Sequence, residues 1–359
     1  MCSARSVPSP RDPIRNHWRM RQTFEYHPVI GFRFVPDIKA RVLHEGGGYL
    51  LRTNSTGFRS DTPFASERHV DKRRILLFGD SFTAGEGVSN GHRYSDHLEK
   101  LIPNLEVYNY GLPATGLDQH FLIYQEYARQ VEHDLLVIAV FVENVHRVGS
   151  RYRYFTDDQG QRVLYAKPYF TLDGGQLELC GVPPAKRPLD PKDLAGEDRQ
   201  YIFTLGGKSP RLKSAVQRMR QHPHFERLVI DSGLLDFAMK ACRYQPIKDY
   251  ADPENAAWIV MQALIRKWIQ DHPKPVVLMP IPLHHYVYGI SSPRAYQTGL
   301  RSVTEAAGGA FVDPLPALLA RPIAERKTYF FRNDHHLTKA GHEALARAIA
   351  PAVANLLTK

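Results

Sequence analysis

The sequence contains little cysteine and no long apolar run. Its three cysteines, Cys2, Cys180 and Cys242, lie far apart, and no CxxC motif occurs in the 359 residues. This pattern favours neither a disulfide framework nor a cysteine zinc site. No stretch approaches the run of about 18 apolar residues that a membrane-spanning helix needs. We therefore expect no transmembrane segment.

The first twenty residues also lack an apolar segment. They read MCSARSVPSPRDPIRNHWRM, which is basic but has no hydrophobic centre. A secretory signal requires such a centre. The sequence therefore predicts a cytoplasmic location.

Basic residues are in excess, but they are not concentrated. The 47 Lys and Arg against 37 Asp and Glu give a net charge of +10. The basic clusters are short, at residues 72–74, 151–153 and 211–220, and no RNA-binding signature or basic heptad helix accompanies them. A solvated basic face is favoured over a nucleic-acid site, so no nucleic-acid partner is expected.

Two parts of the chain alternate between strand and helix patterns. A run such as 134–142 is apolar on both faces, as a central parallel strand should be. The pattern predicts an α/β fold, a flavodoxin-like three-layer α/β/α sandwich with a five-stranded parallel sheet. The expected strands are 74–78, 105–109, 134–142, 275–279 and 310–312; the expected helices are 94–102, 117–131, 254–270, 292–307 and 337–357.

Between these parts the alternation breaks. Residues 151–250 contain a hairpin signal, Asp-Gly-Gly at 173–175, followed by irregular and helical stretches. The chain is accordingly divided into an N-terminal extension packing on the core, two halves of an α/β core, and an insertion after the third strand. The predicted bounds are 1–70 for the extension, 71–150 and 251–359 for the two halves, and 151–250 for the insertion.

The stretch LFGDSFTAGEGV, residues 77–88, places Ser81 at the carboxyl end of the first core strand. Ligands bind at that edge of an open parallel sheet. Ser81 is therefore a candidate nucleophile. The alternative is that it only caps the next helix, since Asp-Ser is common there.

Polar or small residues follow other core strands as well. Gly111 follows the second strand, where a glycine lets a backbone N–H approach a ligand closely. Asn144 follows the third, where a side-chain amide can donate to an oxyanion. His336 precedes the last helix, and Asp334 two residues earlier can hold its imidazole in one tautomer. Each residue alone could equally be a loop glycine, a strand terminator or a helix cap.

Together these blocks resemble the SGNH (GDSL-type) hydrolases, a superfamily of esterases, lipases and carbohydrate deacetylases. The specific matches are GDSFTAGEGV at 79–88 and DHHLTKAGH at 334–342, and NYGLPATGLDQ at 109–119 is a moderate one. The segment NSTGFR, 54–59, looks like one found in bacterial members. The resemblance implies Ser81 as nucleophile, His336 as base and Asp334 as its orienting acid. It further implies an oxyanion hole from the Ser81 and Gly111 N–H groups and the Asn144 amide.

The chain departs from the family pattern at two blocks. The third block usually reads Gly-x-Asn-Asp, and here residues 142–145 are Val-Glu-Asn-Val. The last block usually has its Asp three residues before the His, a position that Asn333 occupies here. His335 competes with His336 for the base role, and the Leu-Thr-x-x-Gly that follows favours His336. Four more residues are expected to line the site: Asp80, Asn333, His284 and His285.

The resemblance predicts a serine esterase acting through an acyl-enzyme, with an O-acetyl group on a carbohydrate as one expected substrate. No metal and no organic cofactor are expected, and two adjacent histidines at 284–285 make a poor metal site. Two alternatives stay open: an O-acyltransferase using the same residues, and a degenerate module that binds without turnover. The insertion's aromatic residues could form a substrate platform or the insertion's own core, and the latter is favoured. The sequence assigns no oligomeric state.

Overall fold

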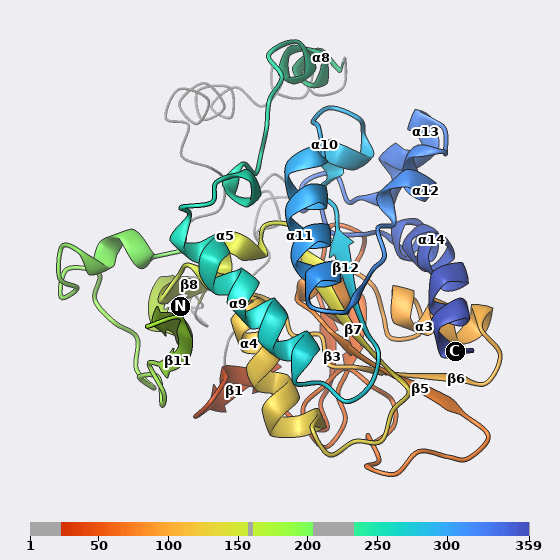
Figure 1. Cartoon of the computed structure of the whole chain (residues 1–359), viewed down its shortest axis with the longest axis horizontal. Helices are drawn as coiled ribbons and strands as arrows, with labels where there is room; N and C mark the ends of the chain where they lie inside the picture. Colours follow the sequence, from red (N-terminus) through yellow and green to blue (C-terminus); the bar gives the residue numbers. More distant parts are fainter. Residues whose placement is uncertain (1–22, 157–160, 204–232, 359) are drawn as a thin grey trace, which may run out of the picture.

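The computed structural model describes residues 23–156, 161–203 and 233–358. Five parallel strands form the central sheet in the order β13-β12-β7-β5-β6 (Figure 1). In chain order this is 5-4-3-1-2, the flavodoxin-like arrangement, so the predicted fold class is confirmed. The strands are β5 (Arg73–Phe78), β6 (Leu105–Asn109), β7 (Leu135–Phe141), β12 (Val276–Ile281) and β13 (Ala310–Phe311).

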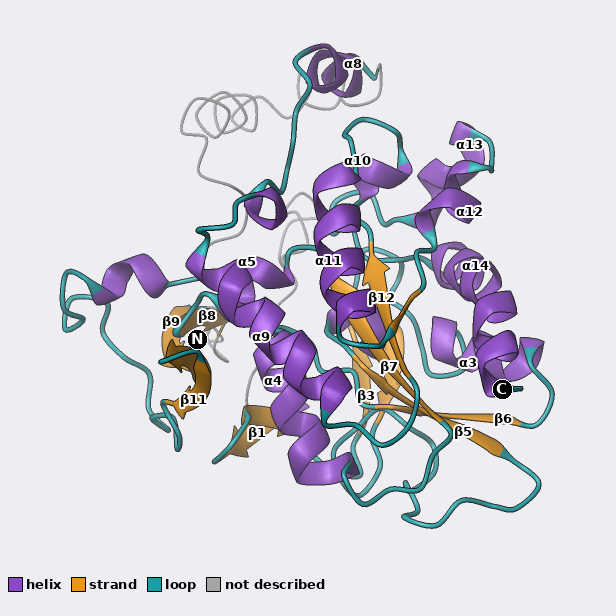
Figure 2. Ribbon diagram, viewed as in Figure 1, coloured by secondary structure: helices purple, strands orange, loops and turns teal. Residues whose placement is uncertain are grey.

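Helices cover both faces of this sheet, as Figure 2 shows. On one side α3 (Tyr94–Leu101) packs against α14 (Lys339–Leu357), and on the other α4 (Leu117–Ile123), α9 (Ala256–Gln270) and α11 (Arg294–Ala306) form a group. Every residue of β7 and β12 is buried because both faces are covered. None of the described helices is long and apolar enough to cross a membrane.

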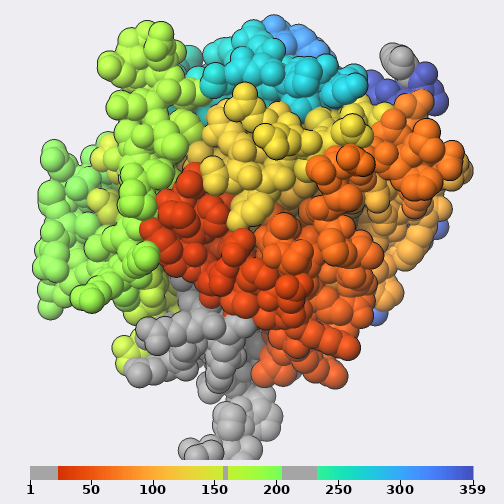
Figure 3. Space-filling view, turned by 90° about the horizontal axis from the view of Figure 1, so that it is seen from below, coloured from red at the N-terminus to blue at the C-terminus, as the bar shows by residue number. Residues whose placement is uncertain are grey.

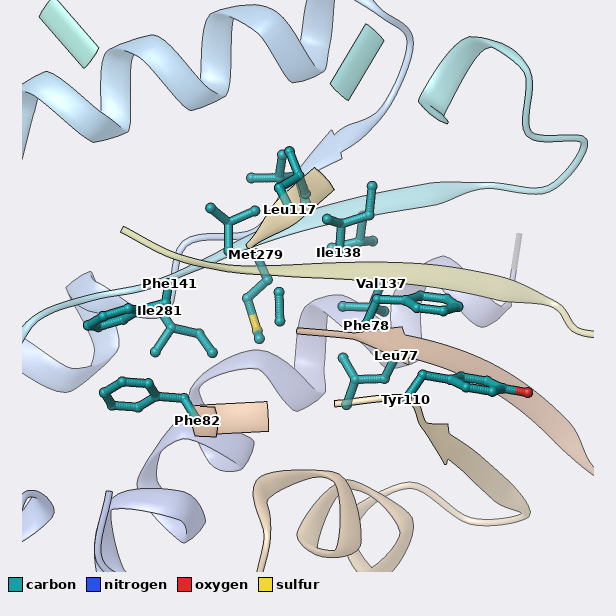
Figure 4. Close-up of a cluster of buried hydrophobic side chains, with 14 of the residues drawn as sticks. Leu77, Phe78, Phe82, Tyr110, Leu117, Val137, Ile138, Phe141, Met279 and Ile281 are labelled. Atoms are coloured by element: carbon teal, nitrogen blue, oxygen red, sulfur yellow. The ribbon is translucent and has the colours of Figure 1, made fainter. Parts of the chain in front are cut away.

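Aromatic side chains fill the core beside the central strands (Figure 4). Phe78 stacks on Tyr110 with ring centroids 5.0 Å apart, and the ring of Trp268 meets Phe78 edge-on at 5.2 Å. Nearer the strand ends, Phe82 stacks on Phe141 at 4.3 Å. Such pairs contribute beyond their buried area, and they fix the start of the chain segment that leaves β5.

All five helices differ from their predicted bounds, and two of these differences have a visible local cause. The helix expected over 117–131 ends as α4 at Ile123 and continues as a π-helical turn, η1 (Tyr124–Ala128). The helix expected from 337 begins at Lys339, because the Thr338 hydroxyl accepts from the Gly341 N–H at 3.2 Å and caps it. The spacing of apolar residues predicts neither the π-helical turn after Ile123 nor the cap at Thr338.

The N-terminal segment forms two hairpins, β1 (Phe24–His27) with β2 (Gly31–Phe34) and β3 (Lys39–Val42) with β4 (Tyr49–Arg52). Figure 3 shows the segment, in red and orange, on the surface beside the yellow part of the core. Its NSTGFR turn carries Arg59, whose guanidinium is buried and bonds to the segment that follows Ser81.

The insertion begins with two hairpins, β8 (Tyr152–Thr156) with β9 (Arg162–Ala166) and β10 (Tyr169–Asp173) with β11 (Gln176–Cys180). The second confirms the predicted hairpin, with a two-residue Gly-Gly turn because Asp173 still pairs with Gln176. Its other described elements include η2 (Asp198–Tyr201) and α8 (Leu234–Ala241).

The insertion is tied to the core by a buried ion pair between Lys167 and Asp118, the latter in the first turn of α4. Phe170 is buried and packs against Phe121 of that helix. At least this aromatic residue of the insertion therefore serves the core and not a substrate platform. The four-part division of the chain itself stays a prediction.

Candidate active site

Ser81 lies where β5 leaves the sheet. It is the first residue of α2 (Ser81–Ala84), a single turn whose cap is Asp80: the Asp80 Oδ1 accepts from the Phe82 N–H at 3.1 Å. The loop after β6 packs directly on this turn, and a Cβ at Gly111 would lie 2.4 Å from the Ala84 nitrogen. Gly111 is therefore required for the close approach that brings the ends of β5 and β6 together.

The structure brings Ser81, His336 and Asp334 into one hydrogen-bonded row. The Ser81 Oγ lies 2.8 Å from His336 Nε2, and His336 Nδ1 lies 2.7 Å from Asp334 Oδ2. A hydroxyl, an imidazole and a carboxylate in this order form the arrangement that activates a serine. The helix-cap alternative for Ser81 is wrong, because Asp80 supplies the cap.

A tight turn before α14 sets the direction of these side chains. The Phe331 N–H donates to the His336 carbonyl at 2.8 Å, and the His335 N–H donates to the Phe331 carbonyl at 3.1 Å. His335 takes a left-handed backbone conformation with φ of +61°. Its ring accordingly points elsewhere and stacks on His284 at 4.0 Å, while His336 reaches Ser81.

Three carboxylates surround the His336 imidazole. Burial lowers the pKa of His336, but Glu86, the hydrogen bond to Asp334 and the more distant Asp80 together raise it to about 9. Glu86 returns to the site because its N–H donates to the Ser81 carbonyl at 2.9 Å. The Phe82 ring lies 4.7 Å from the imidazole and covers it. The site thus favours the protonated imidazolium.

Asp334 remains ionised in this environment. Burial raises the pKa of its carboxyl, but the hydrogen bond and charge of His336, with a second hydrogen bond from His44, hold it well below its usual range. The Asp334 Oδ2 accepts from His44 Nε2 at 2.7 Å. When the imidazole is neutral, an ionised carboxylate at Nδ1 keeps the ring proton there and leaves the lone pair on Nε2, facing the serine.

The three groups expected to bind an oxyanion differ in availability. Ser81 begins α2, so its N–H has no acceptor within the helix. The Gly111 N–H donates to Asn109 Oδ1 at 2.9 Å. The Asn144 amide donates to the Phe141 carbonyl at 2.9 Å and to Asp80 Oδ2 at 3.3 Å. Two of the three donors therefore face internal acceptors, and their oxyanion role stays a prediction.

Asp80 lies beneath the site and is not exposed to a substrate. Its side chain is fully buried, and Oδ2 forms a 2.6 Å ion pair with Arg147 Nη1. Arg147 follows Asn144 by three residues on α5 (Asn144–Val148), so both reach the same carboxylate. Arg147 also donates to the Thr115 carbonyl at 2.9 Å. This arginine balances a negative charge that would otherwise oppose an oxyanion.

Asn333, His284 and His285 are the remaining expected lining residues. Asn333 is exposed, and its side chain bonds to Glu45 at 2.7 Å. His284 and His285 begin α10 (His284–Val287), with their rings 3.9 Å apart. Burial and the nearby His335 lower the pKa of His285 to about 4. Among the described residues, no group of three or more His, Cys, Asp or Glu side chains could hold a metal ion.

Sequence reasoning missed four residues that the structure brings to the site: His44, Arg59, Glu86 and Arg147. Glu86 lies within the recognised GDSFTAGEGV stretch, which does not explain its side chain, and Arg147 lies two residues after the 142–145 block. Arg59 ends the NSTGFR segment, 54–59, which was singled out only because it looks like a segment of bacterial SGNH hydrolases. No sequence signal marks His44, because its contact with Asp334 spans 290 residues of chain.

The chain matches no model of a known protein family and no curated protein. Solved structures resemble it distantly. A lipolytic protein of the G-D-S-L family from Veillonella parvula is 10% identical with a TM-score of 0.38, covering 78% of this chain and 97% of that chain. A lipase/acylhydrolase from Enterococcus faecalis is 12% identical with a TM-score of 0.40, covering 79% and 96%.

An acetylxylan esterase from Geobacillus stearothermophilus is 15% identical with a TM-score of 0.39, covering 78% of this chain and 94% of that chain. These likenesses are too distant to assign an activity. Function is therefore inferred from the geometry around Ser81.

Proposed function

We propose that the protein is a serine hydrolase of the SGNH type that cleaves an ester through an acyl-enzyme. One observation carries the proposal: Ser81 Oγ lies 2.8 Å from the Nε2 of His336, whose other nitrogen lies 2.7 Å from the Asp334 carboxylate. Polar groups in a row of this order, buried or partly buried, serve no evident packing need. They match what nucleophilic catalysis requires.

In the first half of the reaction His336, in its neutral form, takes the Ser81 proton at Nε2 while Oγ bonds to the acyl carbon. The carbonyl becomes a tetrahedral oxyanion. When it collapses, the bond to the leaving alcohol breaks and that oxygen receives the proton from Nε2. The acyl group is then esterified to Ser81.

In the second half His336 takes a proton from water, and the resulting hydroxide oxygen attacks the acyl carbon. The Ser81 oxygen leaves with the proton from Nε2, and the acid is released. Asp334 stays ionised throughout and stabilises the imidazolium. A sugar hydroxyl in place of the water would make the same site an O-acyltransferase.

The Ser81 N–H is the donor best placed to meet the oxyanion, because it begins α2 and points out of the helix. Gly111 and Asn144 can join it only if substrate displaces their present acceptors, Asn109 Oδ1 and the Phe141 carbonyl. Each donor so recruited would lower the barrier by about 2.7–4 kcal/mol. An acetylated carbohydrate is the substrate class that we propose first, from the likeness of the motifs.

The test is release of acetate from p-nitrophenyl acetate and from peracetylated sugars, each with and without a free sugar as acceptor. We expect turnover that Ser81→Ala and His336→Ala abolish. Ser302→Ala, an exposed serine on α11, and His335→Ala are the matched controls and should remain active. Acetylated acceptor in place of free acetate would establish transfer. Sugar binding without turnover, unchanged in Ser81→Ala, would establish a binding module instead.

A further inference from the structure

A second histidine approaches the same oxygen of Asp334 that holds His336. His44 Nε2 and His336 Nδ1 each lie 2.7 Å from Asp334 Oδ2. The His44 side chain is only 1% exposed. It comes from the turn between β3 and β4, which belongs to the N-terminal segment and not to the α/β core.

The ring of His44 has a defined tautomer. Its Nδ1 accepts from the Gly46 N–H at 3.3 Å, so the ring proton sits on Nε2 and is donated to Asp334. The ring is therefore a hydrogen-bond donor to the carboxylate. Two imidazole N–H groups then share one carboxylate oxygen.

Close packing fixes the position of this ring. The His44 and Phe331 rings meet edge-on with centroids 4.4 Å apart, and the Tyr49 ring also lies edge-on to His44 at 6.0 Å. Gly87, six residues after Ser81, leaves space for both rings because it has no side chain. A Cβ there would lie 2.9 Å from His44 and 2.5 Å from Phe331. The ring is locked between the segment after Ser81 and the turn that carries Asp334.

From this geometry we infer that His44 is a positioning residue of the proposed hydrolase, a fourth member of the Ser81–His336–Asp334 row. It holds the Asp334 carboxylate in line with His336 Nδ1, and its N–H partly offsets the negative charge of that carboxylate. The inference rests on the proposed function for its catalytic consequence. The hydrogen bond itself does not depend on that function.

The physical consequence has two parts. Without the His44 donor the carboxylate can rotate away from Nδ1, which slows proton transfer at Nε2. While the carboxylate stays in contact with Nδ1, its charge, no longer shared with His44, also binds the imidazolium more strongly, which raises the pKa of His336. Glu86 and Asp80, the other acidic groups acting on His336, and Tyr49, whose pKa the charge of Asp334 raises, are unchanged by the loss.

Two substitutions separate donation from packing. His44→Phe keeps a ring between Phe331 and Tyr49 but removes the donor. His44→Gln keeps an N–H donor but removes the ring. Glu45→Gln is the matched control, because Glu45 binds the same turn through the Asn333 backbone and side chain without touching Asp334.

We expect His44→Phe to lower kcat about ten- to a hundredfold with KM changed less than about twofold, as for one lost bond to a charged group. His44→Gln should recover much of the loss, and Glu45→Gln should stay near wild type. If His44→Phe keeps wild-type kcat, or His44→Gln is impaired as much as His44→Phe, the residue acts only by packing and the inference is wrong.

A measurement without substrate keeps the two proposals distinguishable. In protein labelled with ¹⁵N-histidine, wild-type His44 should show a protonated Nε2 and an unprotonated Nδ1. The His336 ring should titrate near pH 9, and at higher pH in His44→Phe. An Nδ1-protonated His44, or a His336 titration unchanged in His44→Phe, overturns the inference. These spectra are informative even if the wild type hydrolyses no ester, a result that would refute the proposed function alone.

Discussion

Glu86 Oε2 lies 3.5 Å from His336 Nε2, the nitrogen that also contacts Ser81. The Glu86 side chain is 5% exposed, so solvent screens its charge little. A second carboxylate therefore acts on the His336 imidazole, at the nitrogen that does not face Asp334. It raises the pKa of the resting imidazole, and in the proposed reaction it stabilises the imidazolium that forms when Ser81 gives up its proton.

The first prediction concerns the pH dependence of turnover. Because the pKa of His336 is raised to about 9 and only the neutral imidazole can act as base, kcat/KM should fall about tenfold per pH unit below that value. Glu86→Gln should move this acid limb toward neutral pH and raise kcat/KM at pH 7. A pH–rate series on both proteins checks this, with the exposed Glu305→Gln as control. An acid limb near pH 6.5 in the wild type would contradict it.

The second prediction applies the same pKa to stability. A folded-state pKa above the ordinary 6.5 means that His336 adds stability that is fully present below about pH 6.5 and is lost as pH rises through about 9. The wild-type free energy of unfolding should therefore decline across this window by up to about 3 kcal/mol from this group. Urea titrations at pH 6 and 9.5 should show a smaller decline in Glu86→Gln. Equal declines in the wild type and in Glu86→Gln would show that Glu86 does not cause the raised pKa of His336.

The third prediction concerns the buried Asp80–Arg147 pair. Arg147→Met leaves a fully buried carboxylate without its partner, which should cost about 3–5 kcal/mol of unfolding free energy. Asp80→Asn keeps the cap on α2, so the double variant should regain most of this loss. Denaturant unfolding of the two single variants and the double variant forms the cycle. Additive losses would show that the two charges do not depend on each other.

The fourth prediction concerns Arg59. Its guanidinium donates to the carbonyls of Ala84, Gly85 and Val88 at 2.6–2.8 Å. Lysine has one compact ammonium group in place of this fork. Arg59→Lys should therefore destabilise the fold by about 1–3 kcal/mol for each carbonyl left unbonded and speed proteolysis within residues 84–90. Arg52→Lys, whose ion pair with Asp61 is exposed, is the control and should change little.

The sequence predicted the sheet well because its strands are locally marked. The apolar run of β7, and the change from apolar to small and polar residues after Phe78, can each be recognised from adjacent residues in the sequence. The positions of Ser81 and His336 follow, since parallel strands bring their carboxyl ends to one edge. The π-helical turn after Ile123 and the start of α14 at Lys339 depend on single bonds that periodicity does not encode.

The electrostatics of the site could not be read in the same way. His44, Glu86 and Arg147 act through contacts with residues far away in the chain or on another element. The sequence offered a histidine in a glycine-rich turn, a glutamate between glycines and an arginine near a strand end. His44 meets Asp334, Glu86 meets His336 and Arg147 meets Asp80. These contacts depend on how the N-terminal hairpin, the segment after α2 and α5 pack together.

The most direct test of an activated Ser81 is covalent labelling. The purified protein is treated with a fluorophosphonate probe at pH 7 and pH 9, and the modified peptide is located by mass spectrometry. We expect phosphonylation of Ser81 that is faster at pH 9, absent in Ser81→Ala and greatly slowed in His336→Ala, with Ser302→Ala labelled as the wild type. A folded wild-type protein that takes no label, or whose label persists in Ser81→Ala, would contradict the proposed function.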